Sequence, residues 1–187
     1  MAVDEEELAA RCLSGDQTAI RAFVEHFQEL VFAICLRRLR NREDAEDVAQ
    51  QSLVRAVRHL RNWDPRRPLK PWVLTIAVNR CRTKLGQRSH QTQSFDQKLD
   101  APAPERRIGV LDLAEELELA LGKIREEYRT CFTLFHQQEL SVTRVAEIME
   151  CPEGTIKTWL HRARRELAEL LIDRGVVTKG GYELHRI

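Results

Sequence analysis

The sequence lacks the features that mark several protein classes. It has no apolar run long enough to cross a bilayer and no N-terminal signal peptide, so we expect a cytoplasmic protein without membrane insertion. Its five cysteines show no CxxC or CxxH spacing, and the six histidines do not cluster with them, which predicts free thiols and no zinc site. Cys35, Cys81 and Cys131 fall at apolar helix positions. No nucleophile–base set, glycine-rich phosphate loop or metal cluster is present, so we expect neither an enzyme nor a cofactor.

The sequence also lacks an excess of charge of one sign. Its 30 basic and 29 acidic residues give a formal net charge of +1. A nucleic-acid site must therefore arise from local segregation of charge, which leaves other surfaces acidic. This pattern favours a protein with two kinds of partner over one that simply coats nucleic acid.

Helical periodicity predicts an all-α fold of two small helical domains joined by a flexible linker. Residues 1–88 form the first predicted domain. The polar stretch 89–110, with its Ala-Pro-Ala-Pro run, is the predicted linker. Residues 111–173 are the second domain, a four-helix unit, and 174–187 are a loose tail.

Residues 141–171 predict a helix-turn-helix. A short apolar stripe precedes a turn with Pro152 and Gly154, and a longer helix then keeps its apolar residues on one face. Its other face and first turn carry no acidic residue from position 155 to 165 and should attract phosphate. The candidate contacts are Thr155, Lys157, Thr158, His161, Arg162 and Arg165. An ordinary helical hairpin with a solvated basic face is the alternative interpretation.

Residues 43–60 predict an amphipathic helix with polar residues on its first exposed turns, namely Asp44, Glu46, Asp47, Gln50 and Gln51. Acids near a helix start are favourable in any protein. A second interpretation is that this face docks on a basic protein partner.

A basic loop follows at residues 61–71, which contain three prolines and Trp63. Basic side chains beside an aromatic ring suit an unstacked base of single-stranded nucleic acid. The alternative is a connector whose Trp63 packs on the core. The next predicted helix, from Trp72 to Leu85, has a basic outer side that begins with Asn79 and Arg80.

In this order the motifs resemble the extracytoplasmic-function (group IV) sigma factors of the sigma-70 family, the two-domain initiation subunits of bacterial RNA polymerase. The motifs are DAEDVAQQ at 44–51, Trp72 followed by IAVN at 76–79, and PEGTIK at 152–157 followed by HRAR at 161–164. The resemblance extends from about Thr18 to Leu171.

The resemblance implies three contact surfaces. In a region 2 domain, Asp44, Asp47, Gln50 and Gln51 would dock on the clamp of core RNA polymerase. The loop and following helix would open the −10 promoter element and hold a non-template base, through Asn62, Trp63, Arg66, Arg67, Lys70, Asn79 and Arg80. In a region 4 domain, the second helix of the helix-turn-helix would read the duplex −35 element. The linker would enter the polymerase cleft, and such factors are commonly inhibited by an anti-sigma factor encoded elsewhere.

Several positions depart from the family pattern. Gln51 stands where an acidic residue is frequent, Leu53 replaces an aromatic, and Glu150 replaces a turn glycine. Trp159 replaces an arginine, which we expect to remove a phosphate contact and add core packing. The alternative function is a stand-alone helix-turn-helix regulator with an N-terminal sensor or dimerisation domain, which would not need the acidic helix and basic loop.

Overall fold

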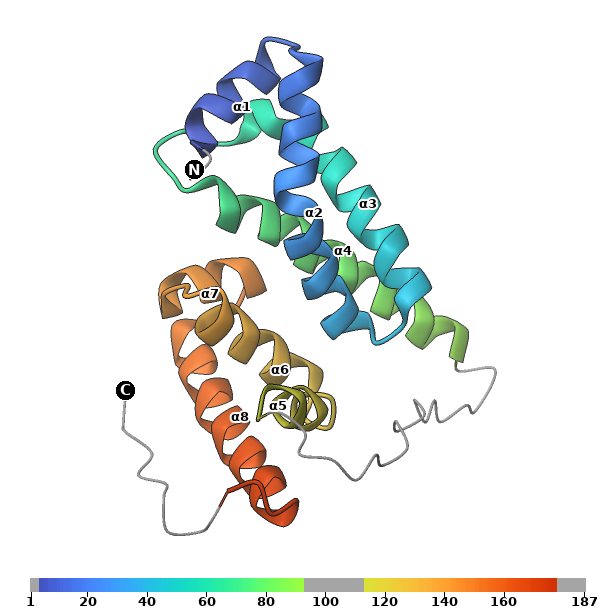
Figure 1. Ribbon diagram of the computed structural model, residues 1–187, viewed down its shortest axis with the longest axis vertical. Coiled ribbons are helices and arrows are strands. Elements are labelled where there is room, and N and C mark those ends of the chain that lie inside the picture. Colours follow the sequence, from blue (N-terminus) through green and yellow to red (C-terminus); the bar gives the residue numbers. More distant parts are fainter. Residues whose placement is uncertain (1–3, 93–112, 178–187) are drawn as a thin grey trace. The chain divides into compact units, whose positions relative to one another are not determined.

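The computed structural model describes residues 4–92 and 113–177, which form two compact helical units (Figure 1). Every regular element in these ranges is a helix, which confirms the predicted all-α class and the two-domain organisation. No helix in the described ranges combines the length and apolar character needed to span a membrane. The predicted linker lies outside the described residues except for its first four positions.

The N-terminal unit contains α1 (Glu5–Leu13), α2 (Gln17–Leu39), α3 (Arg42–His59), the 3₁₀ turn η1 (Leu60–Asn62) and α4 (Leu69–Thr92). The local sequence determines where the first three helices begin. The side chains of Asp4, Asp16 and Asn41 each accept hydrogen bonds from backbone N–H groups of the turn that follows. These caps satisfy donors that have no partner within the helix.

The core of this unit surrounds α2, which packs against α1, α3 and α4. Phe23 and Phe27 of α2 are almost fully buried, and their ring centroids lie 4.9 Å apart. Cys35 and Cys81 are also fully buried, as their apolar helix positions predict. Since the buried stripes of α3 and α4 face α2, the polar sides of both helices remain at the surface.

The limits of α4 differ from the prediction. It begins at Leu69 and includes Pro71, because a proline in the first helical turn gives up an N–H that has no partner there anyway. It also continues to Thr92, four residues into the predicted linker. Residues 89–92 contain no proline or glycine, so nothing in the local sequence ends the helix there.

The C-terminal unit contains α5 (Leu113–Leu121), α6 (Glu126–Phe132), the π-helical segment η2 (Thr133–Gln137), α7 (Val142–Met149) and α8 (Glu153–Asp173). The α5 and α6 helices pack on α8. Leu121 of α5, Ile124 of the connecting turn and Tyr128 of α6 form a buried cluster with residues of α8 that include Ala163 and Leu167. This arrangement is the predicted four-helix unit.

The predicted loose tail is wrong for its first residues. After α8 the chain closes a Schellman motif, in which Gly175 has a φ of 73° and the N–H of Val176 donates to the carbonyl of Leu171 over 3.0 Å. The Arg174 guanidinium holds the carboxylate of Glu116 on α5, with Nη2 3.0 Å from Oε1. Val176 and Val177 pack on the core. Residues 174–177 are therefore anchored to the unit, and residues 178–187 lie outside the described ranges.

Candidate nucleic-acid and protein interfaces

The helix-turn-helix is formed by α7 and α8. In the turn between them, Glu150 has a left-handed φ of 53° at the position where the family commonly has glycine. The hydroxyl of Thr143 on α7 donates to the Glu153 carboxylate over 2.7 Å and ties the two helices together. On α8, Ile156, Leu160, Ala163 and Leu167 are buried, as predicted. This packing fixes which side of α8 faces outward.

The outward side of α8 carries the predicted duplex contacts. Lys157, Thr158, His161, Arg162 and Arg165 are exposed, and Thr155 is half-buried. These side chains therefore share the surface opposite the core.

Both arginines of this candidate set have hydrogen-bond or ion-pair partners within the unit. Arg162 Nη1 donates to the hydroxyl of Tyr128 over 3.0 Å, and Arg165 Nε lies 3.2 Å from a carboxylate oxygen of Glu169. Side chains in the second pair are exposed by 69% and 62%, so the pair is weak and can exchange for a phosphate. Sequence reasoning missed Tyr128, which belongs to α6 and is buried. Trp159 is half-buried and packs on the core beside it, as predicted.

Trp63 is buried against the core, which agrees with the connector interpretation of the 61–71 stretch, and its contact with a −10 base stays a prediction. Its side chain is only 7% exposed and belongs to the core, and its indole N–H donates to the backbone carbonyl of Arg67 over 3.0 Å. The alternative interpretation of the 61–71 stretch, a connector with Trp63 packed inward, is the one that the structure supports. The ring holds the loop in place through this hydrogen bond.

The other loop candidates lie at the surface. Asn62, Arg66 and Arg67 are exposed, and Lys70 is half-buried. Arg66 donates to the side chain of Asp64 from both its Nε and its backbone N–H, and these hydrogen bonds lower the pKa of the Asp64 carboxyl. The loop is thus basic, and hydrogen bonds between its own residues stabilise its conformation.

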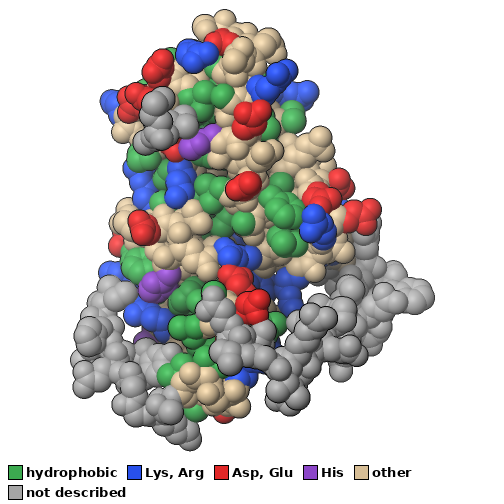
Figure 2. Space-filling view, viewed as in Figure 1, with side chains coloured by type: hydrophobic (Ala, Val, Ile, Leu, Met, Phe, Trp, Pro, Cys, Tyr) green, Lys and Arg blue, Asp and Glu red, His purple; other side chains and the backbone are tan. Residues whose placement is uncertain are grey.

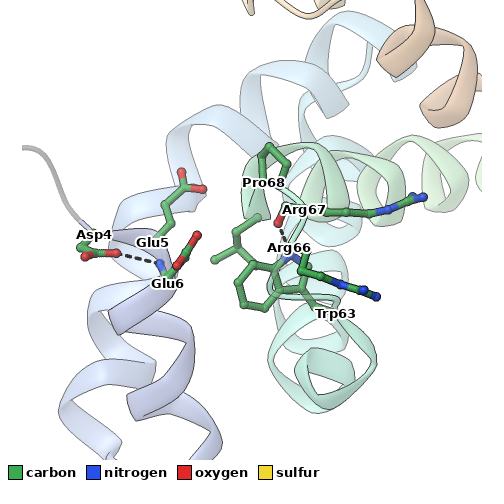
Figure 3. A pocket seen from close by; sticks show the side chains of 8 residues that line it. Asp4, Glu5, Glu6, Trp63, Arg66, Arg67 and Pro68 are labelled. Atoms are coloured by element: carbon green, nitrogen blue, oxygen red, sulfur yellow. Dashed lines mark hydrogen bonds between the residues drawn. The ribbon is translucent and has the colours of Figure 1, made fainter.

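A cavity of about 610 Å³ lies between this loop and the start of α1. Figure 3 shows the acidic residues Asp4, Glu5 and Glu6 on one side and Trp63 and Pro68 on the other. Arg66, Arg67 and Leu69 complete the lining. Sequence reasoning missed the α1 carboxylates, because no local pattern connects the start of the chain with this loop.

Three further candidates, Asp44, Gln51 and Arg80, lie with Lys84 and Arg88 along what we call the α3–α4 seam. The Lys84 ammonium lies 2.8 Å from one carboxylate oxygen of Asp44, and Arg88 binds the other. Arg80 donates to the side-chain oxygen of Gln51. Two of the four predicted docking residues of α3, Asp44 and Gln51, therefore contact the basic side of α4 directly.

Away from the seam, Asp47 and Gln50 of α3 are exposed. On α4, Asn79 is half-buried and its side-chain oxygen accepts from Arg82 over 3.0 Å. Figure 2 shows acidic and basic side chains interspersed on the face in view, in keeping with the near-neutral net charge.

Comparisons with known proteins give a consistent result. Residues 23–91 match the family model of sigma-70 region 2, and residues 114–167 match that of sigma-70 region 4. The chain is 28% identical over 172 residues to the ECF RNA polymerase sigma factor SigW of Bacillus subtilis, covering 85% of this chain and 92% of that protein. It is 28% identical over 173 residues to the ECF RNA polymerase sigma-E factor of Haemophilus influenzae, covering 86% and 91%.

Among solved structures, the chain is similar to the sigma factor RpoE from Bartonella quintana, crystallised with the anti-sigma factor NepR. The TM-score is 0.70 and the identity 26%, over 81% of this chain and 96% of that one. Because the region 2 match covers most of the N-terminal unit, a stand-alone regulator with a sensor or dimerisation domain is not favoured.

Proposed function

This chain belongs to the extracytoplasmic-function sigma factors of the sigma-70 family, which act in transcription initiation, and we propose that it does so through three surfaces. The outer side of α3 binds core RNA polymerase. The 61–71 loop and α4 hold the melted −10 element, and α8 reads the duplex −35 element. Sigma factors are not enzymes, and we propose that this one works without catalysis, in the cytoplasm, where it meets polymerase.

Docking on polymerase would use the exposed side of α3. Asp47 and Gln50 are exposed there, and Val54, one of the few exposed large apolar residues in the described ranges, lies on the same helix. A single exposed apolar residue is ordinary on a protein surface, so Asp47 and Gln50 carry this part of the proposal. Asp44 and Gln51 would contribute less directly, because both already contact α4.

Opening of the −10 element would rely on the capture of an exposed base rather than on a catalysed reaction. Asn62, Arg66 and Arg67 are exposed on the loop and can contact phosphates or base edges. Lys70, Asn79 and Arg80 of α4 are half-buried. Holding an unstacked base offsets an unstacking cost of a few kcal/mol. Trp63 would act indirectly, by fixing the loop through its hydrogen bond to Arg67.

Recognition of the −35 element would place the first turns of α8 in the major groove. An arginine such as Arg162 can bind guanine with two hydrogen bonds, while Lys157 and Thr158 can bind phosphate. The observation that carries the proposal is the continuous exposed face of α8, free of acidic residues from 155 to 165 and backed by a fully buried stripe.

An anti-sigma factor is a further proposed partner. One similar solved structure is that of a sigma factor with the anti-sigma factor NepR, and another is that of CnrH with the cytosolic domain of CnrY. A protein of this kind would cover the surfaces that polymerase or DNA needs.

The proposal is tested by mixing the purified chain with bacterial core RNA polymerase and a library of promoter fragments, and then sequencing the transcripts. We expect polymerase-dependent initiation downstream of a shared two-part motif. A matched reaction with the Arg162→Ala/Arg165→Ala variant should lose preference in the −35 part only. Tight duplex binding by the chain alone, with no initiation, would instead support the stand-alone regulator.

A further inference from the structure

The α3–α4 seam connects two surfaces to which we assign different partners. The helices run antiparallel along it, so Gln51 meets Arg80 while Asp44, nearer the start of α3, meets Lys84 and Arg88 near the end of α4. The acceptors come from the proposed polymerase-binding helix, and the donors come from the proposed DNA-binding helix. A substitution on one helix therefore changes the side-chain contacts of the other helix.

Asp44 is the fixed member of its cluster. It lies in the first turn of α3, where the helix dipole favours a negative charge, and its side chain is only 18% exposed. Arg88 also donates to the carbonyl of Leu39 over 3.1 Å, which holds its guanidinium close to Asp44.

The two cations remain accessible. The side chains of Lys84 and Arg88 are exposed by 33% and 32%. Both are long and flexible enough to turn from a carboxylate to a nearby phosphate, and partly exposed ion pairs exchange readily. With Asp44 in place, the cluster carries one net positive charge instead of two, so its attraction for phosphate is reduced.

We propose that Lys84 and Arg88 form a phosphate-binding pair for single-stranded DNA, and that Asp44 restrains this pair in the free protein. The strand is the partner because Asn79 and Arg80, proposed contacts of the melted −10 element, precede the pair on the same helix. Polymerase binding to α3 that draws the Asp44 carboxylate away would release Lys84 and Arg88 from that carboxylate, so polymerase binding and strand binding would strengthen one another. This last step rests on the proposed function, whereas the restraint itself does not.

The restraint is tested with the full chain, without polymerase, by fluorescence anisotropy on a labelled single-stranded oligonucleotide at several salt concentrations. Asp44→Asn should tighten binding roughly three- to tenfold at low salt, and the slope of log affinity against log salt should steepen by about 0.7 for each phosphate gained. Asp47→Asn is the matched control, because it removes the same charge from an exposed position on the same helix. Adding Lys84→Gln and Arg88→Gln to Asp44→Asn should abolish the gain.

Equal affinity of the Asp44→Asn and Asp47→Asn variants, with both folded by circular dichroism, would overturn the proposal. A gain that survives the loss of Lys84 and Arg88 would overturn it as well.

If Asp44→Asn does not fold, a second comparison decides. Asp44→Ser also removes the charge and suits the first turn of α3, so it should tighten strand binding by the same factor. Equal affinity of the Asp44→Ser and Asp47→Ser variants would contradict the proposal. Transcription with core polymerase tests the proposed function separately, so failure of one leaves the other standing.

Discussion

Replacing Trp63 should destabilise the N-terminal unit rather than remove a direct DNA contact. The side chain is 7% exposed, so Trp63→Ala leaves a large cavity and should cost about 3–5 kcal/mol. Trp63→Phe keeps most of the ring but removes the indole N–H that donates to the Arg67 carbonyl, which should cost about 1–2 kcal/mol. Against a typical total stability of about 5–15 kcal/mol, the alanine variant approaches unfolding of the unit.

The measurement is chemical denaturation followed by circular dichroism, together with amide hydrogen exchange resolved by segment. Exchange separates the N-terminal unit from the C-terminal one, which a single denaturation curve does not. Protection should fall in α1, in the 61–71 loop and at the start of α4, because these elements surround the ring. Arg66→Ala in the same loop is the control, since Arg66 is exposed and its loss should change stability by less than about 0.5 kcal/mol.

Initiation assays then separate structure from contact. At temperatures where Trp63→Phe is folded, initiation should stay close to that of the unchanged chain. If Trp63→Ala left stability and exchange unchanged but abolished promoter opening, the ring would contact DNA directly and the reasoning from burial would be refuted.

Three other predictions concern separate surfaces. Arg162→Ala and Arg165→Ala should each weaken −35 binding by about 1–3 kcal/mol if the arginine binds a base with two hydrogen bonds; unchanged binding by the double variant would remove α8 from the site. Asp47→Ala should lower co-purification with core polymerase without altering the thermal melt, and full recovery of polymerase would contradict the docking surface. The hydrogen bonds from Arg174 lower the pKa of Glu116 below its ordinary value of 4.5, so this pair stabilises the C-terminal unit above that pH, and the contribution is lost as pH falls through the lowered pKa. Arg174→Ala should therefore flatten the acid dependence of the melt, and identical acid profiles would count against the pair.

The helices could be predicted from the sequence because the causes of their formation are local. Apolar residues at helical spacing identified the buried face of α8, and the turn that ends at Pro152 separates it from α7, whereas Gly154, predicted in that turn, lies in the first turn of α8. The ordered motifs identified the family for the same reason, since they are short contiguous stretches. Even the exposure of Lys157 and Arg165 followed from helical geometry alone.

Side-chain partners were decided only by the tertiary structure. Glu116 and Arg174 are 58 residues apart in the sequence, and nothing near either one indicates the pairing. The same holds for Arg162 with Tyr128, and for Asp44 with Lys84, because each contact depends on which helices pack and in what register. A basic or acidic residue can be recognised from the sequence, but whether its charge faces water or a neighbouring helix depends on the packing of distant segments.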